Sequence, residues 1–215
     1  MNIFAIGDIH GCLNELTLLH KKILTHDKFN VKNDLIIYLG DYIDKGKNSK
    51  DAINQILKLK NNIKNWLNFG LDQTLRSYGI EVVDFIKDGF GDDIIDQLRN
   101  TLLSTMSEEH INFFKDLELS FSSEKYLFVH AGIDPKKTLE DQTKEDFLWS
   151  RSKSFFDKDF KAQKIIVHGH TPEENIINNP HRINIDTGCY FSGKLSSVCL
   201  SDHDDSRLFI NNLLK

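Results

Sequence analysis

Two short apolar runs open the chain, and a stretch with helical spacing follows each of them. The first run, Asn2–Ile6, and the second run, 34–39, both stop at Gly-Asp, which predicts two buried strands. Leucine and isoleucine then recur every three or four residues over 13–28 and again over 49–60, which predicts two helices. This opening is typical of an α/β fold, in which ligands bind at the carboxyl ends of the strands.

The rest of the chain divides into a helical part and a strand-rich part. Residues 79–117 are more polar and predict helices near 92–103 and 107–117, which we interpret as a cap inserted over the sheet. We expect a second, mixed or antiparallel sheet packed on the first, within a single domain, 1–215. It is built from short runs with turn residues between them: 117–121, 125–129, 164–167, 182–185, 195–200 and 207–210.

Composition describes an ordinary globular protein. Of 215 residues, 40% are hydrophobic and 27% are charged, and the net charge of −5 argues against general affinity for nucleic acid or anionic membranes. The apolar runs are too short to span a bilayer, and the N-terminus lacks the pattern of a signal peptide. The three cysteines, Cys12, Cys189 and Cys199, have no regular spacing. We therefore expect no disulfide framework and a cytoplasmic location.

Carboxylates follow both of the first two strands. Gly7-Asp8-Ile9-His10-Gly11 places a carboxylate and an imidazole within reach of one cation, and Asp41 takes the same position after the second strand. Carboxylates on adjacent strand ends repel each other unless a cation lies between them. The pattern therefore predicts a divalent metal site.

Imidazoles follow two later strands. His130 stands in V-H-A-G and His170 in H-G-H-T, each after an apolar run and before small residues, which favours metal ligation. Asp186 in D-T-G ends another strand, and we expect it beside the ligands.

The ordered motifs D-x-H-G, G-D-x-x-D, H-A-G, G-H-T and D-T-G resemble the phosphoprotein-phosphatase branch of the metallophosphoesterase (calcineurin-like) superfamily. The resemblance spans nearly the whole chain, and Tyr78 in TLRSYG and Arg151 in LWSR are similar to bacterial and phage serine/threonine protein phosphatases. It implies a metallophosphatase-like two-sheet β sandwich flanked by helices (α/β/β/α), with the helical cap insertion at 79–117.

The resemblance also implies a pair of metals. Asp8, His10 and Asp41 would hold one ion, and Asp41 would bridge to a second ion held by His130 and His170. Carboxylate and imidazole ligands suit Mn²⁺, Fe or Zn²⁺, up to two ions per chain. A hydroxide between the metals would attack the phosphorus.

Three further residues take catalytic roles in the resemblance. Arg151 and Lys45 would bind the phosphate, with lysine standing where the family has an arginine. Asp44 would orient a histidine that protonates the leaving group.

That histidine and one metal ligand belong to a G-N-H-E motif that occurs nowhere in this chain. We interpret the gap as a deletion that removed a core strand, a ligand of the second metal and the general acid, since the second helix runs directly into 66–70. Asn61, Asn62 or Asn65 could replace the lost ligand.

The sequence thus predicts a metal-dependent phosphomonoesterase with impaired chemistry that acts on phosphoserine or phosphothreonine in proteins. A dinucleoside-polyphosphate or other nucleotide phosphohydrolase is the alternative, because one metal core serves both reactions. A catalytically inactive remnant that binds phosphorylated ligands, and a deletion confined to this gene copy, also stay open. The expected partner is a phosphorylated protein or a small phosphoester, with no nucleic acid and no membrane, and the oligomeric state is left open.

Overall fold

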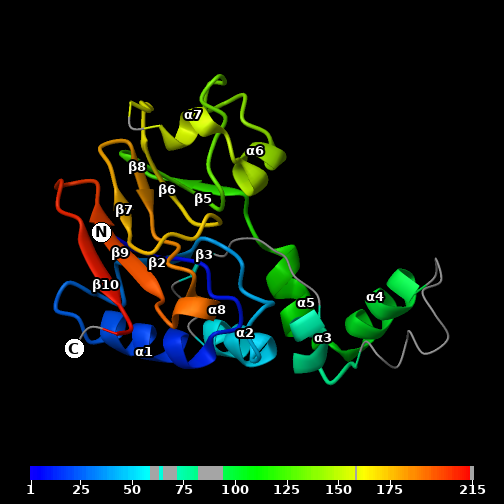
Figure 1. Cartoon of the computed structure of the whole chain (residues 1–215). Helices are drawn as coiled ribbons and strands as arrows, with labels where there is room; N and C mark the ends of the chain where they lie inside the picture. The colour runs from blue at the N-terminus through cyan, green and yellow to red at the C-terminus, as the bar shows by residue number, and fades with distance from the viewer. Residues whose placement is uncertain (59–62, 65–71, 82–93, 158, 214–215) are drawn as a thin grey trace.

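The computed structural model describes residues 1–58, 63–64, 72–81, 94–157 and 159–213. Two five-stranded sheets occupy its middle (Figure 1). In the first sheet the first three strands of the chain run parallel to one another. The last two strands of the chain are antiparallel to each other, and the first of these two also pairs antiparallel with the N-terminal strand. In spatial order its strands are β10 (Leu208–Asn211), β9 (Ser196–Ser201), β1 (Asn2–Ile6), β2 (Leu35–Tyr38) and β3 (Ile63–Lys64).

The second sheet has a parallel centre and antiparallel edges. Its parallel strands end at the same side of the sheet, so their following loops lie together. In spatial order its strands are β4 (Ser120–Ser122), β5 (Tyr126–Val129), β6 (Ile165–His168), β8 (Arg182–Asn184) and β7 (Ile177–Asn178).

Strand β1 is buried on both faces, and its successive side chains point alternately into two different hydrophobic clusters. Ile3 and Ala5 pack in the cluster between the two sheets. Phe4 and Ile6 point the other way, into the cluster that contains helices α1 (Leu13–Leu24) and α2 (Ser49–Leu57). A strand covered on both faces reads as a continuous apolar run, as this one does.

Two short helices, α6 (Lys144–Trp149) and α7 (Lys153–Phe156), lie on the other side of the second sheet (Figure 1). Phe155 of α7 packs against the outward-facing side chains of β5 and β6. Helix layers therefore enclose both sheets, and the predicted α/β class with two sheets flanked by helices is confirmed.

The stretch interpreted as a cap contains both predicted helices, α4 (Ile94–Thr105) and α5 (Glu108–Lys115). Phe113 of α5 packs into the core beside α1 and α2. Tyr78 and Leu98 form a separate small cluster, which joins α4 to α3 (Asp72–Ser77) (Figure 1). That this stretch is an inserted cap on a single domain stays a prediction. Within the described residues, no helix is long and apolar enough to cross a bilayer.

Two topological expectations are wrong. Strands β9 and β10 join the first sheet instead of the second, because β9 pairs along the free edge of β1. A short strand, β3, also lies parallel to β2, where the sequence predicted that a core strand had been deleted. The candidate replacement ligands Asn61, Asn62 and Asn65, and residues 66–70, lie outside the described residues.

Candidate metal centre

Four strand ends meet at one place between the sheets. Because β1 and β2 are adjacent and parallel, Asp8, His10 and Asp41 come together, with ligand atoms within 4.8 Å of one another. From the second sheet, β5 delivers His130 and β6 delivers His170, which form a group of the same size with Asp41. Asp41 belongs to both groups, so the five predicted ligands lie together around one shared carboxylate, and their role in metal binding stays a prediction.

Backbone carbonyls orient two of the imidazoles. The Nδ1 of His10 lies 3.1 Å from the carbonyl oxygen of Ile43, and the Nδ1 of His130 lies 3.1 Å from that of Leu39. Each Nδ1 therefore donates to its carbonyl oxygen, and each Nε2 points into the site, where it can bind a cation when it carries no proton. The two Nε2 atoms flank the carboxylate of Asp41, at 3.1 Å for His10 and 3.6 Å for His130.

His170 and Asp8 are in direct contact, which links the two sheets at the site. The backbone N–H of His170 donates to Oδ2 of Asp8 at 2.9 Å, and its Nδ1 lies 3.0 Å from Nε2 of His130. A side chain at Gly169 would clash with the Asp8 carboxylate, so only glycine allows this approach. The other oxygen, Oδ1 of Asp8, is buried and accepts no hydrogen bond from the described residues. A bound cation would satisfy this atom.

Backbone strain is concentrated at the same positions. Within the described residues, every non-glycine with a left-handed φ lies in these motifs. Such conformations cost on the order of 1–3 kcal/mol each and gather where function requires them. The residues are His10 (48°), Asp41 (42°), Asp44 (72°), Lys45 (58°) and His170 (66°).

Burial disfavours the charged form of two of the three aspartates at the site. Burial, together with the charge of Asp41, raises the pKa of Asp8 to about 7. Burial and the charge of Asp8 raise the pKa of Asp186 to about 8. For Asp41, burial is outweighed by the hydrogen bond and charge of His10 and by the charge of His130, so its pKa is lowered.

The pKa values of the three imidazoles shift in different directions. Burial lowers the pKa of His130, and burial and His130 lower the pKa of His170 to about 4, so both are neutral ligands at pH 7. For His10, the hydrogen bond and charge of Asp41 outweigh burial and raise the pKa. Buried carboxylates facing neutral imidazole nitrogens are a donor set that fits divalent transition metals.

The three predicted catalytic residues lie around this set. Lys45 is exposed, and its Nζ donates to Nε2 of His10 at 3.1 Å. Arg151 is also exposed and directs its Nε to Nε2 of His170 at 3.4 Å. Asp44 is buried and accepts a hydrogen bond from the hydroxyl of Thr74. Both cations are thus at the metal ligands, and the catalytic roles of all three residues stay predictions.

Two aromatic side chains beside the ligands were not foreseen. Tyr190 lies 5.2 Å from the ring of His10, and Lys45 stacks over it at 4.5 Å. Trp149 lies 5.7 Å from the ring of His170 on the opposite side. Both stand close to motif residues in the sequence, Tyr190 after D-T-G-C and Trp149 within L-W-S-R, and that adjacency was the available signal.

Two further histidines near the motifs have structural contacts. The Nε2 of His168 accepts a hydrogen bond from buried Arg182 at 3.2 Å, and burial and this cation lower the pKa of His168 to about 3. The Nδ1 of His181 lies 3.1 Å from the carbonyl oxygen of Ala162.

Comparison with known proteins gives a match over nearly the whole chain. A family model described as calcineurin-like phosphoesterase matches residues 1–204. An asymmetrical bis(5'-nucleosyl)-tetraphosphatase of Oceanobacillus iheyensis is 26% identical over 92% of this chain and 88% of its own length. A symmetrical bis(5'-nucleosyl)-tetraphosphatase of Wigglesworthia glossinidia brevipalpis is 32% identical over 66% of this chain and 48% of its own. Serine/threonine-protein phosphatase 2 of Salmonella typhimurium is 26% identical over 91% of both chains.

Solved structures share the fold. The structure of a putative diadenosine tetraphosphatase covers 98% of this chain with a TM-score of 0.68 at 15% identity. A metallophosphoesterase from Sphaerobacter thermophilus covers 98% with a TM-score of 0.56 at 14% identity.

Proposed function

The chain belongs to the calcineurin-like phosphoesterase family, and on that premise we propose that it is a metal-dependent hydrolase of nucleoside polyphosphates. The bond cleaved is a phosphoanhydride, and dinucleoside tetraphosphates are the leading substrate class. The sequence alone favoured a phosphoprotein substrate and gave a nucleotide substrate as the alternative. This proposal reverses that order.

The observation that carries this proposal is the pair of exposed aromatic rings at the metal ligands. Tyr190 is 42% exposed beside His10, and Trp149 is 51% exposed beside His170. Exposed aromatic faces stack on nucleobases, and each such contact contributes about 1–3 kcal/mol. An open pocket of about 410 Å³ is lined in part by Trp149 and Arg151, which both contact His170. A substrate with a base at each end of a phosphate chain fits aromatic faces on both sides of the ligands.

The two cations next to the ligands match a chain of phosphates. Lys45 lies at His10 and Arg151 at His170, so positive charge flanks the carboxylates on both sides. Arginine offers a planar fork to phosphate oxygens, and lysine offers a point charge. Divalent ions held by the five ligands supply Lewis acidity and make hydroxide available near neutral pH.

The missing G-N-H-E motif also favours this substrate. Hydrolysis of phosphoserine releases a strongly basic alkoxide, which needs a proton donor, and general acid catalysis is worth about 10²–10⁴ in rate. Cleavage of a phosphoanhydride releases a phosphate, which has a pKa of about 6 and departs without a proton. A site without the family's histidine therefore loses little on a polyphosphate.

A phosphoserine or phosphothreonine protein is the second candidate. The similarity to the Salmonella typhimurium phosphatase over 91% of both chains favours it. Hydrolysis of a phosphoprotein and hydrolysis of a nucleoside polyphosphate differ only in the leaving group and in the protein groups that bind the substrate beside the phosphate.

The test compares kcat/KM, with Mn²⁺ present, for bis(5'-adenosyl) tetraphosphate, an aryl phosphate and a phosphoserine peptide. We expect the dinucleotide to be hydrolysed with the highest efficiency and the peptide with the lowest. Tyr190→Ala should lower kcat/KM for the dinucleotide about tenfold, the equivalent of one stacking contact, and leave the aryl phosphate within about twofold. Tyr190→Phe, which keeps the ring, is the matched control.

Equal efficiency on the peptide and the dinucleotide would show that a general acid is present and would remove the leaving-group argument. An equal loss of both substrates in Tyr190→Ala would remove the stacking argument. Metal binding without activity on any substrate would favour the inactive remnant that binds phosphorylated ligands.

A further inference from the structure

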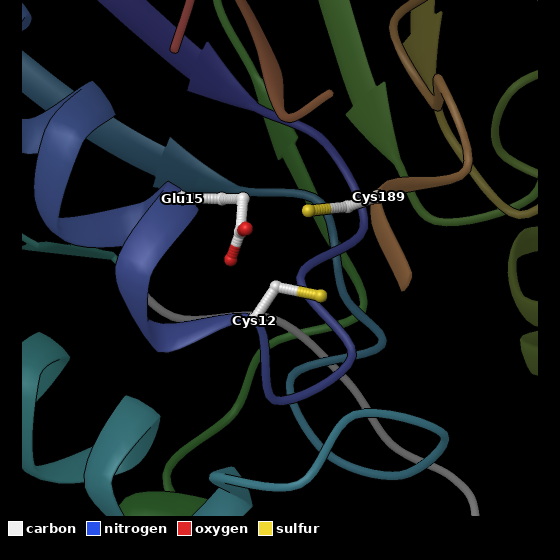
Figure 2. A group of neighbouring side chains, drawn as sticks. All are labelled: Cys12, Glu15 and Cys189. Atoms are coloured by element: carbon white, nitrogen blue, oxygen red, sulfur yellow. The ribbon is translucent and has the colours of Figure 1, made fainter. Parts of the chain in front are cut away.

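A second group of possible metal ligands lies outside the phosphoesterase ligands. Cys12 immediately precedes α1, Glu15 lies in the first turn of that helix, and Cys189 begins helix α8 (Cys189–Ser192). The two sulfur atoms and the carboxylate lie within 4.8 Å of one another. Figure 2 shows all three side chains directed into the space between the starts of the two helices.

From this geometry we infer that Cys12, Glu15 and Cys189 form a separate binding site for a thiophilic divalent cation of the zinc class. The donors are two thiol groups and one carboxylate, whereas the phosphoesterase site contains no sulfur among its five ligands. Zinc and related soft ions prefer thiolate ligands, and manganese and magnesium do not. The site is therefore selective for a different ion, and it does not depend on the proposed hydrolysis.

The spacing of the donors fits one tetrahedral ion. Zinc binds sulfur at about 2.3 Å and carboxylate oxygen at about 2.0–2.2 Å, so two sulfurs on one tetrahedral ion lie about 3.8 Å apart. The three donor atoms lie within 4.8 Å of one another, and side-chain rotations would bring them onto a common centre. A water molecule would complete the fourth position, as in zinc sites with three protein ligands.

The surroundings favour an ion here over simple packing. The sulfur atoms of Cys12 and Cys189 lie within 4.8 Å of each other, although they come from opposite ends of the chain, and the thiol of Cys12 donates to the carbonyl oxygen of His10 at 3.7 Å. Cys189 is only 2% exposed and belongs to the core, yet the carboxylate of Glu15 lies within 4.8 Å of its sulfur atom. Cys12 is the N-cap of a 12-residue helix and makes no capping hydrogen bond with its side chain. The N-terminus of that helix stabilises the negative charge of such a ligand set.

The site would connect two loops of the phosphoesterase centre. Cys12 follows the loop that carries His10, and Cys189 follows the loop that carries Asp186. An ion bound to both cysteines would hold these loops together. Its occupancy would therefore stabilise the folded protein by mass action.

The experiment is a titration of the full-length, reduced protein with Cd²⁺, followed by the ultraviolet charge-transfer band of cadmium thiolates. We expect one equivalent to produce the band and to raise Tm, and excess Zn²⁺ to remove the band. Cys12→Ser and Cys189→Ser should abolish it, and Glu15→Gln should weaken Cd²⁺ binding at least about tenfold. Cys199→Ser is the matched control, because Cys199 is a buried cysteine on β9 outside the group.

Asp41→Asn separates the two centres. This variant removes the shared carboxylate of the phosphoesterase site, so it should bind Mn²⁺ poorly and keep the full cadmium-thiolate band. Cys12→Ser and Glu15→Gln change half-buried side chains and carry the test without depending on the folding of Cys189→Ser. A reduced wild-type protein without the band, or a band that survives Cys12→Ser, would overturn the proposal.

Discussion

Asp41 is the residue on which the two halves of the phosphoesterase site converge. Its two carboxylate oxygens face different imidazoles, His10 from the first sheet and His130 from the second. Its backbone is held at a left-handed φ of 42°, which an aspartate adopts only when the surrounding structure enforces it. The neighbouring imidazoles keep its pKa low in spite of burial, so the carboxylate is charged and able to bridge.

Asp41→Asn should weaken metal binding at both positions. Calorimetric titration of the wild-type protein with Mn²⁺ should show one site clearly tighter than the other, or a single site. The first ion keeps all of its expected ligands, Asp8, His10 and Asp41, whereas the second lacks the ligand that the missing G-N-H-E motif would supply. In the variant both affinities should fall at least about tenfold, since the loss of charge affects every ion that the carboxylate contacts. Asp202→Asn is the control, because Asp202 accepts hydrogen bonds from Ser123 and Lys125 away from the site.

Two equal, tight manganese sites in the wild-type protein would have a different meaning. They would show that another residue supplies the ligand that the missing motif carries in the family. An unchanged affinity in Asp41→Asn would contradict the bridging role itself.

At the level of elements, α6 positions Trp149 and the segment that follows it, although it is only six residues long. Thr143 and Asp146 form a capping box at its start, in which each side chain bonds the other's backbone N–H. A helix this short does not form alone, so its cap and its contacts with the second sheet determine its position. Trp149 ends the helix, and Arg151 comes two residues later.

Thr143→Ala should lower the free energy of unfolding by about 1 kcal/mol, the usual effect of losing an N-cap side chain. Chemical denaturation measures this change. Thr17→Ala is the matched control, because Thr17 lies inside α1, where its hydroxyl bonds the carbonyl of Leu13 and caps nothing. We expect no loss there, since alanine is the better helix former. An equal loss in both variants would show that the cap contributes nothing specific.

The whole molecule responds to pH through buried histidines. His20 is 2% exposed, and its Nε2 lies 2.8 Å from the hydroxyl of Tyr38. Burial lowers the pKa of His20 from 6.5 to about 4. Between these values the unfolded chain binds a proton that the folded chain excludes, so stability is full above pH 6.5 and falls as the pH decreases towards 4.

This single group should account for roughly 3 kcal/mol of lost stability between pH 6.5 and pH 4. The measurement is the free energy of unfolding in urea at several pH values, with EDTA present so that metal binding does not contribute. His20→Gln removes this group and should make the curve shallower over this range, while His168 and His170, whose pKa values are also lowered, continue to contribute. A slope as steep in the variant as in the wild-type protein would assign the pH dependence to other residues.

The features that the sequence determined by itself are local. The alternation and length of apolar runs identified β1, β2 and the helices α1 and α2, because secondary structure depends on neighbours along the chain. Polar residues directly after apolar runs identified Asp8, Asp41, His130 and His170, because a strand delivers the next residues of the chain to the edge of its sheet.

The tertiary structure alone decided which segments became neighbours. Strand β9 pairs with β1 in the first sheet, and β3 lies beside β2, because hydrogen-bonding edges are filled by segments distant in the sequence. The aromatic rings at His10 and His170, and the contact of Cys12 with Cys189, depend on the same long-range packing. Periodicity reports which face of an element is buried, but it does not identify the segment packed against that face, and both proposals rest on the packing.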